Sequence, residues 1–151
     1  MSQSAEEFLA SHELITLATA SKSGEPHAAD IFYVSDGTTV FFSVNPGSQT
    51  AKNLKENPRA SVAVGDAPDE GEDWTAARGI QITGDAVDIE GDEEQEAGQR
   101  FCDRYPYLTD VFKGGDFWRL DPTEVHYVHN DEEGDESIEA LGVEWKREKV
   151  Q

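Results

Sequence analysis

Residues 27–44 read HAADIFYVSDGTTVFFSV, two apolar runs separated by the pair Asp36-Gly37. The β-branched and aromatic residues on each side predict strands, and Asp-Gly is a strong signal for a tight hairpin turn. Two strands joined by so short a turn must pair antiparallel, because a parallel pair needs a long crossover connection. This stretch therefore predicts an antiparallel sheet.

Further apolar runs predict four more strands, at residues 14–20, 60–64, 78–89 and 117–129. The run LITLATA at 14–20 is apolar throughout, which predicts a strand buried on both faces. The strand at 78–89 is expected to bend near Gly84, and the strand at 117–129 to break at Asp121-Pro122. A last short strand or arm is expected at residues 138–145.

Helices are predicted at residues 4–11, 48–56 and 92–105, with a further helical turn at 107–112. Ser4 and Ser48 are of the residue type that caps a helix N-terminus, and Asn57-Pro58 ends the second helix. Hairpin-linked strands with so few helices between them favour an antiparallel barrel with helices packed at its edge, an α+β arrangement that is mainly β. No linker divides the chain, so residues 1–151 are expected to form one domain, with a short N-terminal helix and an acidic C-terminal extension.

The charge is unusual: 32 acids against 12 bases give a formal net charge of -20, and the acids are spread along the chain. A dispersed acidic coat predicts adaptation to high salt, where screening makes self-repulsion tolerable, with an ordinary acidic protein as the alternative. The absence of a basic stretch argues against tight nucleic-acid binding. No apolar run is long enough for a membrane span, the N-terminus lacks signal-peptide character, and Cys102 is the single cysteine, so a cytoplasmic protein is expected.

Several chemical sites are not expected from the sequence. His126 and His129 are three residues apart on a strand, so they face opposite sides, and no other ligands lie at metal-binding spacing. The prediction is therefore no metal site. Cys102 falls on the inner face of a predicted helix, which indicates a small buried hydrophobe rather than a catalytic thiol.

One segment departs from the acidic pattern. Residues 37–65 hold a single acid, Glu56, and three bases, so their formal charge is +2. Within this segment a strand leads through a turn into a helix whose first turn offers Ser48, Gln49, Thr50 and Lys52. Unpaired N–H groups, hydroxyls and an ammonium at a helix start can hold a phosphate, although Ser48 as a simple cap and Lys52 as a solvated residue is the alternative.

The order of the motifs resembles the pyridoxamine 5'-phosphate oxidase-like, FMN-binding split-barrel superfamily, and within it the small YhbP-like branch. The motifs are a helix start at Thr50, Ala51 and Lys52, the strand RGIQITG at 78–84, the triplet Arg104-Tyr105-Pro106 and the strand start Trp118-Arg119-Leu120. The likeness runs from about Leu14 to about Val128.

The resemblance implies a six-stranded antiparallel split barrel with peripheral helices that forms a homodimer, with FMN in a groove at the dimer interface and a small molecule as substrate. It implies a phosphate site at the helix start already described, and an isoalloxazine ring lying along the second and third strands. The matching ring residues are His27, Ala28, Ala29, Asp30, Phe42 and Ser43. Arg78 begins the strand that closes the site, and Trp74, in a polar loop, is the best candidate for stacking on a ligand.

Two departures from the family pattern bear on function. Gln49-Thr50 stands where well-characterised flavin binders often carry Arg-Lys, which weakens phosphate binding because charge-assisted hydrogen bonds are stronger than neutral ones. The basic residues that recognise pyridoxal phosphate in the true oxidases have no clear match, so pyridoxamine 5'-phosphate oxidase activity is not expected. Three hypotheses remain: an FMN-dependent oxidoreductase, a non-catalytic module of the same fold that binds flavin, haem or F420, or a purely structural dimer with an empty groove.

Overall fold

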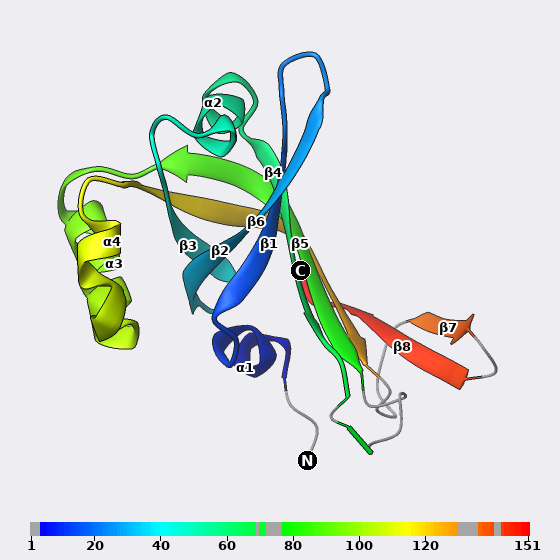
Figure 1. Cartoon of the computed structure of the whole chain (residues 1–151). Coiled ribbons are helices and arrows are strands. Elements are labelled where there is room, and N and C mark those ends of the chain that lie inside the picture. The colour runs from blue at the N-terminus through cyan, green and yellow to red at the C-terminus, as the bar shows by residue number, and fades with distance from the viewer. Residues whose placement is uncertain (1–3, 69, 72–76, 130–135, 141–142) are drawn as a thin grey trace.

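The structure is a computed structural model that describes residues 4–68, 70–71, 77–129, 136–140 and 143–151. Six antiparallel strands form a closed barrel (Figure 1). They are β1 (Leu14–Ala20), β2 (Pro26–Asp36), β3 (Thr39–Val44), β4 (Arg59–Asp66), β5 (Arg78–Asp88) and β6 (Asp116–His129). Their order is β3-β2-β1-β4-β5-β6, and pairing of β3 with β6 closes the ring. The predicted six-stranded antiparallel barrel is confirmed.

The hairpin that predicted this arrangement forms as expected. Asp36 pairs with Thr39 and Tyr33 with Phe42 across β2 and β3. Gly37 has a positive φ of 61°, a conformation that glycine adopts without strain and that primed hairpin turns require. The turn therefore fixes the register that sends alternate residues of both strands into the barrel.

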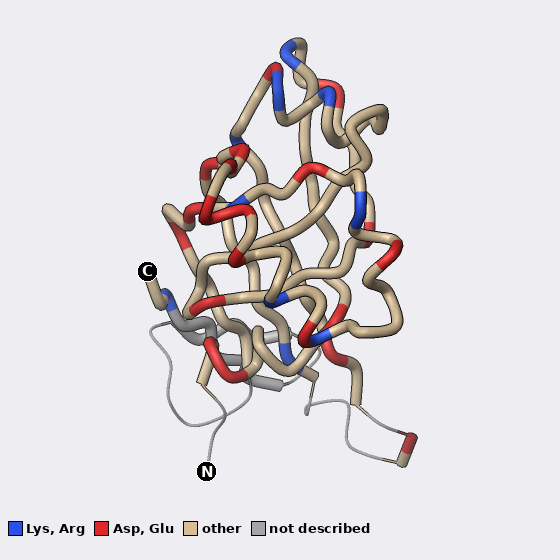
Figure 2. The backbone as a smooth tube through the Cα atoms, turned by 90° about the vertical axis from the view of Figure 1, so that its left-hand side faces the viewer, with Lys and Arg blue, Asp and Glu red and all other residues tan. Residues whose placement is uncertain are grey.

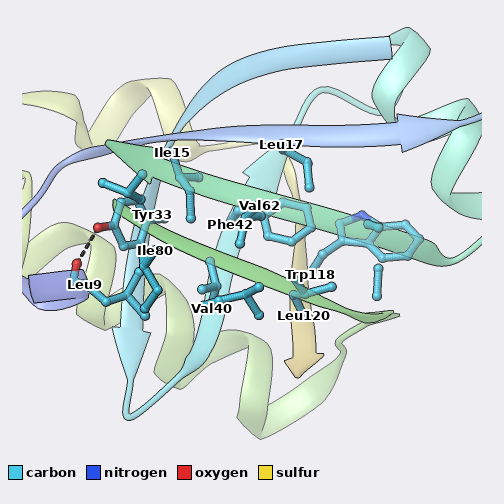
Figure 3. Packing of buried hydrophobic residues seen from close by; sticks show 14 of the residues in the cluster. Leu9, Ile15, Leu17, Tyr33, Val40, Phe42, Val62, Ile80, Trp118 and Leu120 are labelled. Atoms are coloured by element: carbon cyan, nitrogen blue, oxygen red, sulfur yellow. Dashed lines mark hydrogen bonds between the residues drawn. The ribbon is translucent and has the colours of Figure 1, made fainter. Parts of the chain in front are cut away.

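The barrel interior is filled by apolar side chains from all six strands (Figure 3). Fully buried members include Leu17, Val40, Phe42, Ile80 and Leu120. Close packing of such side chains is the main source of stability for a domain of this size. One polar group is built into this core: the buried Tyr33 hydroxyl donates a hydrogen bond to the carbonyl of Leu9.

Strand β1 differs from its prediction. Ile15, Leu17 and Thr19 are buried, but Leu14 and Ala18 are exposed, so the strand is buried on one face and not on both. The physical reason is that α2, which contacts β1, joins the strand at the buried Thr19 and leaves Leu14, Thr16 and Ala18 exposed. An apolar strand thus presents uncharged residues to solvent.

Strand β6 is continuous through Asp121-Pro122, where the sequence predicted a break. The proline is accommodated by a register shift between Thr83 and Gly84 on β5, a β-bulge. At Gly84 a Cβ atom would lie 2.0 Å from the carbonyl oxygen of Asp121, so only glycine fits. The predicted bend at Gly84 is this bulge.

Two short helices close the barrel ends, with α1 (Ala5–Ala10) at one end and α2 (Gln49–Glu56) at the other (Figure 1). Both have the predicted serine caps: Ser4 Oγ accepts from Glu7 N–H, and Ser48 Oγ accepts from Ala51 N–H. Capping of this kind satisfies N–H groups that have no helical partner.

The remaining helices lie against the outer side of β2, β3 and β6 (Figure 1). They are α3 (Gly91–Arg104), the 3-10 turn η2 (Pro106–Leu108) and α4 (Thr109–Phe112). Their buried Phe101, Tyr105 and Phe112 form a second apolar cluster with strand residues. Cys102, predicted to be buried, is partly exposed, because Ala97 and Phe101 occupy the inner face of α3.

After the barrel, β7 (Glu136–Ala140) and β8 (Val143–Lys149) form a hairpin, and β8 adds to the sheet beside β6. The predicted last strand or arm is thus a pair of strands. Acidic residues are spread over the whole backbone trace while basic ones are few (Figure 2). Among the described residues, no helix is long and apolar enough to cross a membrane.

Candidate functional site

A groove of about 500 Å³ lies between strands β2 and β3 and the loop that joins α4 to β6. Its residues come from the middle of β2, from the end of β3 and the turn after it, and from the end of α4 and the loop that follows: Asp30, Ile31, Phe32, Ser43, Val44, Asn45, Pro46, Val111, Phe112, Lys113, Gly114 and Gly115. The groove therefore brings together Asp30 and Ser43, which the sequence predicted as site residues, and the turn that leads to Ser48.

The wall opposite β3 is a loop that contains two glycines. Gly114 has a positive φ of 80°, a conformation that glycine adopts without strain. At Gly115 a Cβ atom would lie 2.4 Å from Ser43 Oγ, so a larger residue would require the Ser43 side chain to move. The two glycines thus let this loop lie close against β3 at the groove.

The lining of the groove mixes apolar and polar surface and includes two charged residues. Asp30 Oδ1 accepts a hydrogen bond of 2.6 Å from Thr16 Oγ1, which fixes the carboxylate on β2. Lys113 supplies the positive charge: its ammonium lies 3.1 Å from Asp110 and is 74% exposed. An exposed ion pair of this kind is weak, so Lys113 can exchange Asp110 for another anion at small cost.

The predicted phosphate seat at the start of α2 lies directly after the groove in sequence, following the turn at Asn45 and Pro46. Ser48 Oγ donates to the carbonyl of Asn45 at 2.7 Å and caps the helix, so its hydroxyl is engaged within the chain. Thr50 is buried at 5% exposure. The N-cap interpretation of Ser48 therefore describes its contacts in this structure.

The other two residues of the predicted phosphate site, Gln49 and Lys52, differ in the contacts that they make within the chain. Gln49 Nε2 donates to Asn53 Oδ1 at 2.8 Å, and Asn53 in turn donates to Thr19 Oγ1 at 3.1 Å. This chain of hydrogen bonds attaches α2 to the end of the barrel. Lys52 is exposed. Of the four predicted groups, Lys52 is thus the one whose charge faces solvent beside the helix start.

The isoalloxazine positions predicted on β2 and β3 do not all face one side. His27 and Ala29 pair with Thr19 and Leu17 on the inner side, whereas Ala28 is exposed on the outer side. Asp30 and Ser43 line the groove. Phe42 is 0% exposed in the barrel core, so its side chain does not reach a ligand, because β3 alternates and Ser43 takes the outward position.

Arg78 and Trp74 complete the predicted set. Arg78 begins β5 opposite Asp66, and its Nη1 donates to the Tyr127 hydroxyl at 3.0 Å. Arg59, at the end of β4 that follows α2, lies about 20 Å from Asp66, the partner of Arg78 at the other end of the strand. The structure therefore does not place Arg78 beside the α2 start within one chain. Trp74 lies outside the described residues.

Sequence reasoning missed the loop side of the groove. Gly114 and Gly115 were interpreted only as the end of a helical turn, and Val111 and Lys113 were not considered as site residues. A glycine pair after a short helix is a signal for close backbone approach, and the lysine beside it is one of only twelve basic residues in the chain. The glycine pair and the neighbouring lysine together are the sequence signal that could have indicated this side of the groove.

A group of acids lies near the other side of α2. The pKa of Asp88 is raised above its ordinary value, first by desolvation and then by repulsion from Asp116 and Glu90, while Lys55 opposes the shift. Lys55 is therefore close enough to Asp88 to stabilise its charged form. In contrast to Lys52, Lys55 acts toward the chain's own carboxylates.

Comparison with known families matches residues 1–129 to the family described as pyridoxamine 5'-phosphate oxidase. The chain belongs to this family. A UPF0306 protein of Citrobacter koseri is 31% identical over 123 residues, 82% of each chain. The family resemblance inferred from the motifs is thereby confirmed.

Solved structures of the same fold differ in the cofactor their names state. The haem binding protein from Mycobacterium smegmatis is 29% identical with a TM-score of 0.68, over 84% of this chain and 55% of that one. A FAD-binding protein from Mesorhizobium loti is 21% identical with a TM-score of 0.62, over 78% of this chain and 84% of that one. The fold is thus found both in a haem-binding and in a flavin-binding protein.

Proposed function

We propose that this chain binds FMN in the groove between β3 and the α4–β6 loop and acts as a flavin-dependent oxidoreductase on a small molecule. The observation that carries the proposal is the lining of the groove, which combines apolar surface with polar groups, among them one carboxylate and one ammonium. Its volume of about 500 Å³ is in the range of cofactor and small-molecule sites.

The residues present fit a flavin. Phe32 and Val111 offer apolar surface to a flat ring. Asp30 is an acceptor fixed by Thr16, suited to the N–H group of a pyrimidine-type ring edge. Lys113 within the groove and Lys52 beside the α2 start supply positive charge for a phosphate. FMN would supply hydride or electron transfer, and the chain would bind and orient it.

Haem is the second candidate, because the haem binding protein from Mycobacterium smegmatis shares 29% identity. The lining of the groove argues against it. Haem iron is usually held by His, Cys, Met or Tyr, and the described residues lining the groove include none of these. The donor set therefore favours a flavin over a haem in this groove.

The absorption spectrum after reconstitution tests the choice. Purified protein mixed with FMN or with haemin, then freed of unbound ligand in high salt, is expected to retain the flavin bands at one FMN per chain. A retained haem band with no retained flavin would contradict the proposal. Turnover with NAD(P)H and an electron acceptor then distinguishes an oxidoreductase from a protein that only stores flavin. Absence of turnover would contradict the proposal that the protein is an enzyme.

We also infer that the outer faces of β1, β4 and β5 meet a second copy of the chain. Register places Thr16 beside Ala63 and Gln81, and Ala18 beside Ser61 and Thr83, and none of these six residues is charged. An uncharged strip on a chain of net charge -20 suits contact with an equally acidic copy, because it brings no like charges together. The apolar character of β1 on both faces supports the same partner.

Sedimentation tests the dimer. Ala63→Lys places a charge in the middle of the strip and is expected to shift the protein toward monomer. Ala67→Lys, the same change at an exposed position after β4, is the control and is expected to remain dimeric. If both variants sediment as the parent does, or if the parent is itself a monomer, the proposed interface is contradicted.

A further inference from the structure

A second cavity, of about 420 Å³, follows the groove along β2: its lining begins at Tyr33, directly after Phe32 of the groove. It is open to solvent and bordered by the α1–β1 connection, the last part of β2 and one side of α3. Its lining residues are Ala10, His12, Tyr33, Val34, Ser35, Arg100, Asp103 and Arg104. It shares no lining residue with the groove, so it is a separate site.

The cavity concentrates positive charge in an acidic chain. Two of the six arginines in the sequence, Arg100 and Arg104, line it, against a single carboxylate, Asp103. Elsewhere acids outnumber bases by more than two to one. Asp36 and Glu96 lie outside the lining and pair with Arg100, so Arg104 is the cation of the cavity that has no carboxylate partner among the ion pairs of the described residues.

Arg104 is held in position by the chain. Its Nη2 donates to the carbonyl of His12 at 2.7 Å, and its Nε donates to the Tyr105 hydroxyl at 3.0 Å. Neither bond uses Nη1. A guanidinium fixed by neutral acceptors keeps its full charge and needs little further ordering to bind an anion.

Arg100 is held more loosely. Its Nη2 lies 3.5 Å from Asp36 and 3.6 Å from Glu96, and the guanidinium lies over the Phe41 ring at 5.9 Å. Both acids are well exposed, and exposed ion pairs of this length contribute little. Arg100 can therefore turn part of its donor set toward a bound anion.

The rest of the lining is suited to the body of an organic molecule. Ala10 and Val34 are apolar, and Ser35 adds a hydroxyl. Apolar walls with a few converging polar groups are typical of small-molecule sites. Arginine in such a place matches the oxygen pairs of carboxylates and phosphates.

We propose that this cavity binds a small organic anion, a molecule with an apolar body and a carboxylate or phosphate group, at a site distinct from the groove. The two arginines recognise the anionic group, and the apolar wall accepts the body. The proposal does not depend on which cofactor the groove holds.

The test uses benzoate and phenyl phosphate as probes, with benzyl alcohol as the uncharged control, all at constant ionic strength. Amide chemical shifts of the full chain are followed by NMR during titration. The expected result is saturable shifts near His12 and Ser35 with at least one anion and none with benzyl alcohol. Whichever anion binds more tightly identifies the anionic group.

Matched variants separate the site from general charge effects. Arg100→Gln is expected to weaken binding about tenfold, as loss of a charge-assisted hydrogen bond does, whereas Lys22→Gln on an exposed turn leaves it unchanged. Ala10→Trp keeps both arginines but fills the cavity, and is expected to abolish binding. Absence of saturable shifts, equal shifts with benzyl alcohol, or equal weakening by Arg100→Gln and Lys22→Gln would overturn the proposal.

Discussion

Individual side chains divide the basic segment around α2 into two kinds of cation. Lys52 is exposed beside the helix start, where N–H groups carry partial positive charge. Lys55 lies near the carboxylate of Asp88. The pKa of Asp88 is raised by desolvation, and the charge of Lys55 opposes that rise. The two lysines carry the same charge and lie on the same helix, but only Lys52 lies near the helix N-terminus, where the N–H groups can bind a phosphate.

The first prediction compares these two lysines. Lys52→Glu is expected to weaken FMN binding about fivefold, as reversing an exposed charge near a phosphate does, and Lys55→Glu to weaken it less. Fluorescence titration of FMN measures both. Equal affinities of the two variants would exclude the α2 start as the phosphate site.

The second prediction concerns Asp88, whose pKa is raised in the folded protein. The folded state then holds its proton more tightly than the unfolded chain does, so deprotonation costs stability as the pH rises through the folded pKa. Asp88→Asn is expected to raise the Tm at pH 7 and low salt, and to leave it unchanged below the ordinary aspartate pKa.

Thermal unfolding across pH measures this effect, with the exposed Glu25→Gln as a control that is expected to show no such dependence. A Tm for Asp88→Asn that is lowered at pH 7 would show that the carboxylate stabilises the fold.

At the scale of elements, local signals in the sequence were sufficient for the strands, the hairpin and the two serine-capped helices. They were insufficient where an outcome depended on a distant segment. Asp121-Pro122 indicates a break, but Gly84 on the neighbouring strand absorbs the proline as a bulge. LITLATA indicates burial on both faces, but the single chain supplies cover for only one.

The site was predictable to the same limited extent. Asp30 and Ser43, which the family resemblance implied as flavin-ring residues, both line the groove. Lys113 and Gly115 were missed because the loop before β6 reaches β3 only in the folded chain. Phe42 was wrongly expected at a ligand because the alternation of β3 turns it into the core.

The bulge gives a prediction at this scale. Gly84→Ala places a methyl group against the Asp121 carbonyl and is expected to lower the free energy of unfolding by about 2 kcal/mol or more. Gly65→Ala on β4, where a Cβ meets nothing within 4 Å, is the matched control. Urea denaturation measures both, and equal losses would show that the close approach at Gly84 is not what requires glycine.

For the whole molecule, the decisive quantity is the net charge of -20. Salt shortens the screening length from about 10 Å at 0.1 M to about 3 Å at 1 M, which weakens repulsion between dispersed carboxylates. The Tm is therefore expected to rise steeply with potassium chloride over this range. Sucrose at matched osmolality is the control, and a Tm that stays flat or falls with salt would contradict adaptation to high salt.

The central claim is that the groove between β3 and the α4–β6 loop binds FMN, and an equilibrium titration at high salt tests it most directly. The parent chain is expected to bind FMN saturably at one per chain. Lys113→Glu, which reverses the charge in the groove, is expected to weaken binding about fivefold or more, while Lys22→Glu leaves it unchanged. No saturable binding, or the same affinity for both variants, would contradict the account.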